Sequence, residues 1–94
     1  MTTATFKMKR KDLNSMMINR CVEVPDNLAL SILVQQRAFE IGYRWIATGT
    51  ELDSSAISCL IYFYEDKVMA YSGIRGTRER MPARDFLAIE ILPD

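Results

Sequence analysis

The hydrophobic and polar positions along the chain change their spacing several times, and each change marks an expected element. Residues 19–24 are rich in strand-forming side chains and end at Pro25, which is typical of a strand. Ahead of them, residues 4–9 alternate apolar and basic side chains. Residues 1–12 are therefore expected to form either an edge strand, which lysines protect from unwanted pairing, or a mobile basic arm.

A helix is expected after this first strand. Either Asp26 or Asn27 can serve as its N-cap, because both side chains accept hydrogen bonds from the first free N–H groups of a helix. The helix is expected to end near Ile41, because Gly42 adopts the positive φ of a helix C-terminus at little cost.

The apolar residues of this helix fall into two stripes, although a helix on one sheet needs only one. Polar Ser31 and Gln35 separate the stripes on one flank. The second stripe therefore indicates either a deeply embedded helix or a contact with another molecule, such as a second copy of the chain. The first stripe is Leu28, Ile32 and Phe39, and the second, which is the candidate oligomer contact, is Leu30, Val34, Ala38 and Ile41.

Four further strands are expected in the rest of the chain. Residues 43–48 alternate in character with a period of two. Residues 56–64 are apolar almost throughout, which is typical of a central strand covered on both faces. Residues 67–72 are expected to return as the second arm of a hairpin, and residues 86–92 to form the last strand.

These elements predict one α+β domain spanning residues 1–94, in the order β-α-β-β-β-β. Short connections favour a mostly antiparallel sheet of four to five strands, with one main helix packed on one face. The other face also carries apolar side chains, including Tyr62 and Tyr64. Since a single helix cannot cover both faces, we expect a homodimer or a partner to cover the second.

The composition argues against catalysis. Histidine, the commonest general base and a frequent metal ligand, is absent. Cys21 and Cys59 lie in apolar runs, so buried free thiols are favoured over a disulfide, a metal pair or a nucleophile. No two carboxylates have surroundings that would separate their pKa values for acid–base work. We therefore expect a protein that is not an enzyme and needs no metal or cofactor.

Two further properties concern partners and location. Twelve basic and twelve acidic residues cancel, which argues against a dedicated duplex-DNA binder. The first residues lack the apolar core of a signal peptide, and no apolar run approaches the roughly 20 residues of a membrane helix. A cytoplasmic location without membrane contact is expected.

Residues 73–84 are the most suggestive segment, because they combine glycines with four arginines. Arginine binds phosphate and carboxylate with two parallel hydrogen bonds, although the spacing matches no phosphate-loop signature. The alternative is a solvated loop whose arginines pair with Glu79, Asp85 and Glu90. The candidate partner- or phosphate-binding residues are Arg75, Arg78, Arg80 and Arg84, together with a second basic cluster of Lys7, Lys9, Arg10 and Lys11.

RNA binding is the alternative to protein binding. The phosphate backbone of RNA can lie along the basic clusters. Its bases can stack on aromatic side chains in the expected strands, such as those of Trp45 and Tyr64. Packing within the sheet would explain the same aromatic residues without RNA. If both basic clusters lay on the same face of the protein, together they would strengthen the case for RNA binding.

Residues 24–27, 34–45 and 67–71 together resemble small uncharacterised accessory proteins of tailed bacteriophages. The shared pattern is a strand, a helix, a Gly-Tyr-x-Trp strand beginning at Gly42, and a hairpin with a tyrosine in its return strand. The resemblance implies an early-expressed protein in an infected bacterium that binds and inhibits or redirects a host macromolecule, such as a defence factor or a toxin. The arginine-rich segment lies outside this pattern.

Overall fold

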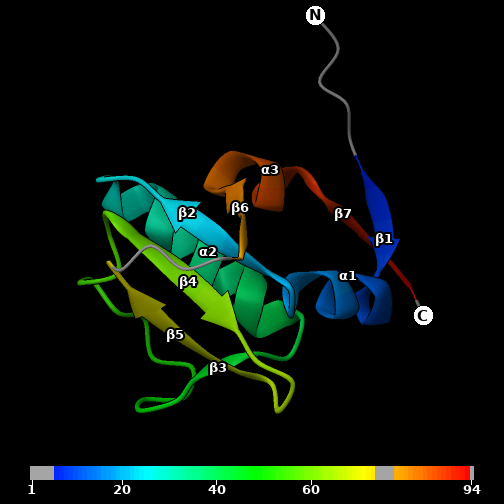
Figure 1. The fold of residues 1–94 in the computed structure, drawn as a ribbon, viewed down its shortest axis with the longest axis horizontal. Coiled ribbons are helices and arrows are strands. Elements are labelled where there is room, and N and C mark those ends of the chain that lie inside the picture. The colour runs from blue at the N-terminus through cyan, green and yellow to red at the C-terminus, as the bar shows by residue number, and fades with distance from the viewer. Residues whose placement is uncertain (1–5, 74–77, 94) are drawn as a thin grey trace, which may run out of the picture.

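The computed structural model describes residues 6–73 and 78–93, and Figure 1 shows how the elements are arranged. Two sheets are present in this part of the chain, one of five strands and one of two. The elements are β1 (Lys7–Lys9), α1 (Arg10–Met17), β2 (Arg20–Val24), α2 (Leu28–Glu40), β3 (Arg44–Trp45), β4 (Cys59–Phe63), β5 (Val68–Ser72), β6 (Glu79–Pro82), α3 (Ala83–Ala88) and β7 (Glu90–Leu92).

The larger sheet has the strand order β3-β5-β4-β2-β6. Its elements follow one another along the chain as β2, α2, β3, β4, β5 and β6, so the predicted α+β class is confirmed, although the last strand of this sheet is not the predicted one. The expected hairpin is also present, because β4 pairs antiparallel with β5. The sheet is mixed, however, since the edge strands β3 and β6 run parallel to their neighbours. Each parallel pair joins strands that are not consecutive in the chain, which requires a crossover instead of a tight turn.

Two predictions about the C-terminal segment were wrong. Residues 79–82, expected in a loop, form β6, and the expected strand over residues 86–92 is instead α3 followed by the short β7. Ala83 and Phe86 are both buried. Their spacing of three residues places them on one face of a helix, whereas a short apolar run by itself fits either a helix or a strand.

The N-terminal segment is a strand and a helix. Residues 7–9 form β1, which pairs with β7 and not with the larger sheet. The helix α1 was not predicted. Leu13 and Met17 are four residues apart on one side of α1, and both are fully buried. This apolar pair anchors α1 to the core, although the sequence around it is basic and typical of a solvated segment.

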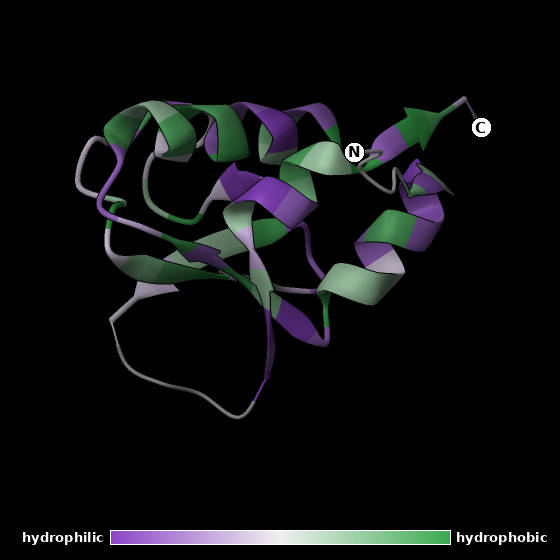
Figure 2. Ribbon diagram, turned by 90° about the horizontal axis from the view of Figure 1, so that it is seen from above, coloured by the Kyte–Doolittle hydropathy of each residue, from purple (hydrophilic) through white to green (hydrophobic). Residues whose placement is uncertain are grey.

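The helix α2 lies along one face of the larger sheet (Figure 2). The side chain of Asn27 accepts a hydrogen bond from the backbone N–H of Leu30 at 3.1 Å, and Gly42 has φ +100°, so both predicted ends are confirmed. Within the described residues, no helix is both long enough and apolar enough to cross a bilayer.

The predicted oligomer contact on α2 needs correction. Val34, Ala38 and Ile41 are at most 1% exposed, because they pack into the chain's own core. Leu30 is half-buried at the edge of that core. Val34, Ala38 and Ile41 therefore face the sheet and cannot contact another molecule in this fold. The homodimer itself stays a prediction, without this stripe as its contact.

Ser31 and Gln35, expected to be polar dividers between the stripes, are both 0% exposed. The Oε1 atom of Gln35 accepts hydrogen bonds from Trp45 Nε1 at 3.1 Å and from the backbone N–H of Asp53 at 2.7 Å. Its Nε2 group donates to the Asp53 carbonyl at 2.9 Å and to Ser31 Oγ at 3.0 Å. Ser31 Oγ in turn donates to the Ala56 carbonyl. This network ties the chain ahead of β4 to α2.

Candidate binding site

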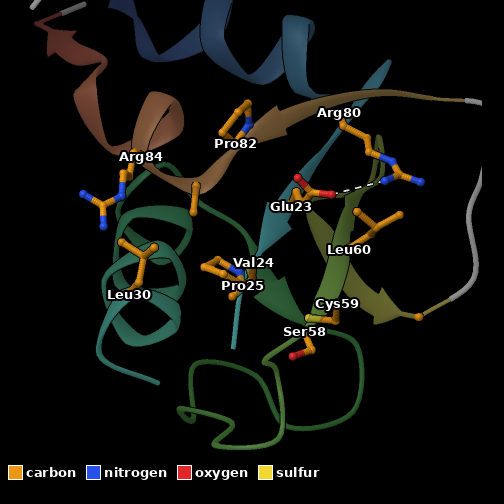
Figure 3. Close-up of a pocket in the computed structure, with 12 residues that line it drawn as sticks. Glu23, Val24, Pro25, Leu30, Ser58, Cys59, Leu60, Arg80, Pro82 and Arg84 are labelled. Atoms are coloured by element: carbon orange, nitrogen blue, oxygen red, sulfur yellow. Dashed lines mark hydrogen bonds and ion pairs between the residues drawn. The ribbon is translucent and has the colours of Figure 1, made fainter. Parts of the chain in front are cut away.

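A pocket of about 410 Å³ opens where β2 ends, β4 begins and β6 runs into α3 (Figure 3). Its volume falls in the range of small-ligand and side-chain pockets. Most of the lining is apolar, and the charged side chains come from β2, β6 and α3. The lining residues are Glu23, Val24, Pro25, Leu30, Ser58, Cys59, Leu60, Gly73, Arg80, Pro82, Ala83 and Arg84.

Strand register builds one wall of the pocket. Glu23 on β2 pairs with Leu60 on β4 and with Pro82 on β6, so these three side chains form a row on one face of the sheet. The neighbouring residues Val22 and Ile61 pair on the opposite face and belong to the core. This row lies on the sheet face opposite to α2, whereas Leu30 of α2 and the core residues Val24 and Cys59 complete the lining of the pocket.

Two arginines border this apolar wall. Arg80 donates from Nη1 to Glu23 Oε2 at 3.1 Å, which offsets its charge and orients its guanidinium (Figure 3). Arg84 is exposed on α3 and makes no ion pair within the described part of the chain. One uncompensated positive charge is left beside an apolar surface, and a carboxylate or phosphate would complement it.

A third arginine lies further along the same sheet face. The guanidinium of Arg78 lies over the rings of Tyr62 and Tyr64, with its Cζ 5.5 and 5.2 Å from the two ring centroids. It also donates a hydrogen bond to the Phe63 carbonyl at 2.8 Å. Arg78 is thus held against β4, where it covers part of the aromatic surface.

Of the four arginines predicted as binding residues in the segment 73–84, the structure describes the three that follow residue 77. Arg80 and Arg84 line the pocket and Arg78 lies over Tyr62 and Tyr64, whereas Arg75 lies outside the described residues. The second cluster, which extends from Lys7 to Lys11 on β1 and α1, does not reach this pocket.

The ion pairs differ from those of the solvated-loop alternative. Arg80 pairs with Glu23 on β2 and not with a carboxylate of its own segment. Glu79 pairs with Arg20 at 3.5 Å, and Glu90 pairs with Lys7 at 3.8 Å. Because Lys7 and Glu90 are more than half exposed, their pair adds little stability.

Both thiols are buried and free, as the sequence predicted. Burial, together with the nearby negative charge of Asp53, raises the pKa of Cys59 from its ordinary value of 9.0 to about 11. Burial also raises the pKa of Cys21, against an opposite effect of Arg80 and Arg78. The thiolate is the nucleophile, so neither cysteine is activated at neutral pH. The described residues contain no group of three or more potential metal ligands.

Stability is expected to fall as the pH rises from 9 to 11. In the unfolded chain Cys59 loses its proton near pH 9.0, whereas in the folded chain it keeps it until about pH 11, so unfolding releases a proton between these values. The loss is on the order of 2 to 3 kcal/mol. Urea unfolding of wild type and Cys59→Ala across this range checks it, and an equally steep fall in both would contradict the assignment.

Several pocket residues escaped the sequence analysis. Glu23, Leu60 and Ser58 join the pocket only through strand register and through the loop ahead of β4. Ser58 has φ +50°, and its N–H donates to the Pro25 carbonyl at 3.2 Å. No local sequence signal marks this contact, because its two partners are 33 positions apart in the printed sequence.

Comparison with models of protein families, with curated proteins and with solved structures finds no match. Function is therefore inferred from the pocket and the surfaces beside it.

Proposed function

We propose that the protein is a non-enzymatic binding protein that holds an acidic segment of a macromolecular partner at this pocket. The observation that carries the proposal is the unpaired Arg84 at a pocket lined mostly by apolar side chains, among them Leu30, Leu60 and Pro82. An apolar side chain of the partner would fill the pocket, and a neighbouring carboxylate would meet the guanidinium.

One of the two pocket arginines is held in place by an ion pair, whereas the other is free to meet a partner. Glu23 fixes the guanidinium of Arg80 at one side of the wall, which lowers the conformational entropy lost when a partner binds. Arg84 has no comparable partner within the chain and is the group that gains most from an incoming carboxylate.

The resemblance to accessory proteins of tailed bacteriophages supports a specific setting for this activity. In that setting the partner is a host protein, such as a defence factor or a toxin, that is inhibited or redirected in the host cytoplasm. Genes of this kind often cluster by task, so neighbouring genes with anti-defence roles would support the setting.

Replacement of Arg84 by glutamate is expected to abolish retention of the partner. The change reverses a charge that makes no ion pair in the described chain, so folding should be unaffected. Pull-down from bacterial lysate with tagged wild type, Arg84→Glu and Arg44→Glu measures the effect. Arg44 is the matched control, because it is also exposed but lies on β3 at the opposite edge of the sheet.

A host protein retained by wild type and Arg44→Glu but at least tenfold less by Arg84→Glu would support the site. Equal retention by all three proteins, or no retained protein, would contradict it. Circular dichroism of each variant establishes that the fold is intact.

RNA binding is a second candidate, favoured by the contact of Arg78 with Tyr62 and Tyr64. An unpaired base could stack on this exposed surface while the guanidinium contacts phosphate. Tyr64→Ala is expected to weaken binding of a single-stranded RNA oligonucleotide about tenfold. Tyr71→Ala is the control, since Tyr71 is 39% exposed against 40% for Tyr64 but lies on the opposite sheet face. Binding that does not weaken between about 50 and 200 mM salt would exclude this candidate.

A further inference from the structure

A second surface lies on the other side of β6, along the edge of the larger sheet. In the strand order, β6 pairs with β2 on one side and with no strand of the described chain on the other. Alternate residues of a strand direct their N–H and C=O groups to each side. The outer edge of β6 therefore offers backbone hydrogen-bonding groups to another chain, although Pro82 has no N–H to donate.

A groove of about 460 Å³ follows this edge. All four residues of β6, from Glu79 to Pro82, line it. The opposite wall comes from β1 and α1, and Figure 1 shows that these elements lie across from β6. Phe6, at 65% exposure, forms part of the groove wall, and three methionines also line it. Methionine adapts to different side chains, which suits a binding surface.

The charges around this groove are almost all compensated. Lys7 pairs with Glu90, Arg20 with Glu79, and Arg80 with Glu23. Asp85 on α3 also lines the groove, and its exposed carboxylate makes no ion pair within the described chain. The groove thus has one uncompensated negative charge, which a basic side chain complements.

We propose that this groove binds an extended segment of a partner polypeptide that adds to β6 as a further strand. Backbone pairing with β6 supplies affinity, and alternate apolar side chains of the segment contact the methionines. A lysine or arginine of the segment meets Asp85. The groove shares only Arg80 and Pro82 with the pocket beside Arg84, and the two cavities favour ligands of opposite charge.

The test uses a synthetic heptapeptide of alternating threonine and valine with one central lysine. The peptide is titrated into ¹⁵N-labelled protein to millimolar concentration while amide chemical shifts are followed. Shifts are expected at Glu79, Arg80 and Met81 and at neighbouring β1 residues, because Pro82 has no amide N–H. The control peptide has the same sequence with alternate backbone amides N-methylated, which removes strand pairing without changing charge. It should bind at least tenfold more weakly.

A charge exchange tests the role of Asp85. Replacing the peptide's lysine by glutamate should weaken binding to wild type about threefold to fivefold, as for a partly exposed ion pair. The Asp85→Lys variant should invert that preference. Asp85 is exposed, so this change should leave the fold intact. An inverted preference together with shifts along β6 would establish the site.

Three results would overturn the proposal. These are equal binding of the N-methylated peptide, shifts confined to residues away from β6, and no shift at millimolar peptide. If the protein alone dimerises by light scattering and Asp85→Lys abolishes the dimer, the groove belongs to a second copy and the peptide proposal fails. Binding of RNA in the groove in place of peptide would also contradict it.

Discussion

Replacement of Gln35 by leucine is expected to lower the free energy of unfolding by about 4 kcal/mol, because several buried polar groups lose their partners together. Trp45 Nε1 and both backbone groups of Asp53 bond to this side chain, which is fully buried. Leucine keeps the volume but offers no hydrogen bond. Urea unfolding followed by circular dichroism measures the loss, and the fluorescence of Trp45, the only tryptophan, should change in the native state.

Gln36→Leu provides the matched control for this prediction. Gln36 is the next residue on α2 and is exposed, so the same chemical change there should alter stability by no more than about 0.5 kcal/mol. Domains of this kind are stable by only about 5 to 15 kcal/mol, so Gln35→Leu should also be visibly closer to unfolding at 37 °C. If the two variants unfolded at the same urea concentration, the Gln35 network would not be the main anchor of the chain before β4.

Replacement of Phe86 by alanine is expected to cost about 3 to 5 kcal/mol, the usual loss for a buried aromatic residue. Phe86 is fully buried, and its ring lies 5.9 Å from that of Phe63, which in turn meets the ring of Tyr43 at 4.7 Å. Alanine at this position removes one end of this aromatic cluster and leaves a cavity. Thermal and urea unfolding measure the change.

Leu87→Ala is the control on the same helix. Leu87 is only partly buried, so its truncation should cost clearly less than that of Phe86. In an extended strand, side chains 86 and 87 would lie on opposite faces, and the order of the two losses would depend on which face met the core. A larger loss for Leu87→Ala would therefore argue against α3 and for the strand expected from sequence.

The two stability predictions concern the supports of the candidate pocket. Gln35 and Ser31 hold the chain that leads into Ser58 and Cys59. Phe86 anchors α3, which carries Arg84. A pocket formed by strand ends and a short helix depends on such anchors, because loop segments have few contacts of their own.

The sequence alone determined the parts of the fold that local chemistry specifies. The cap at Asn27, the glycine after Ile41 and the continuous apolar run of β4 each have a local physical cause, and each was predicted. The α+β class follows from these elements, since one helix between strands must pack on the sheet they form.

Tertiary structure decided what local patterns leave ambiguous. The run from Phe86 to Ile89 is apolar enough for a helix or a strand, and only its packing against β2 and α2 selects α3. From the sequence alone, Gln35 is expected at the protein surface. It is buried in the structure because Asp53 and Trp45 supply its hydrogen-bond partners. Strand register likewise brings distant residues into one pocket, and register depends on the whole sheet because each strand aligns with its neighbours.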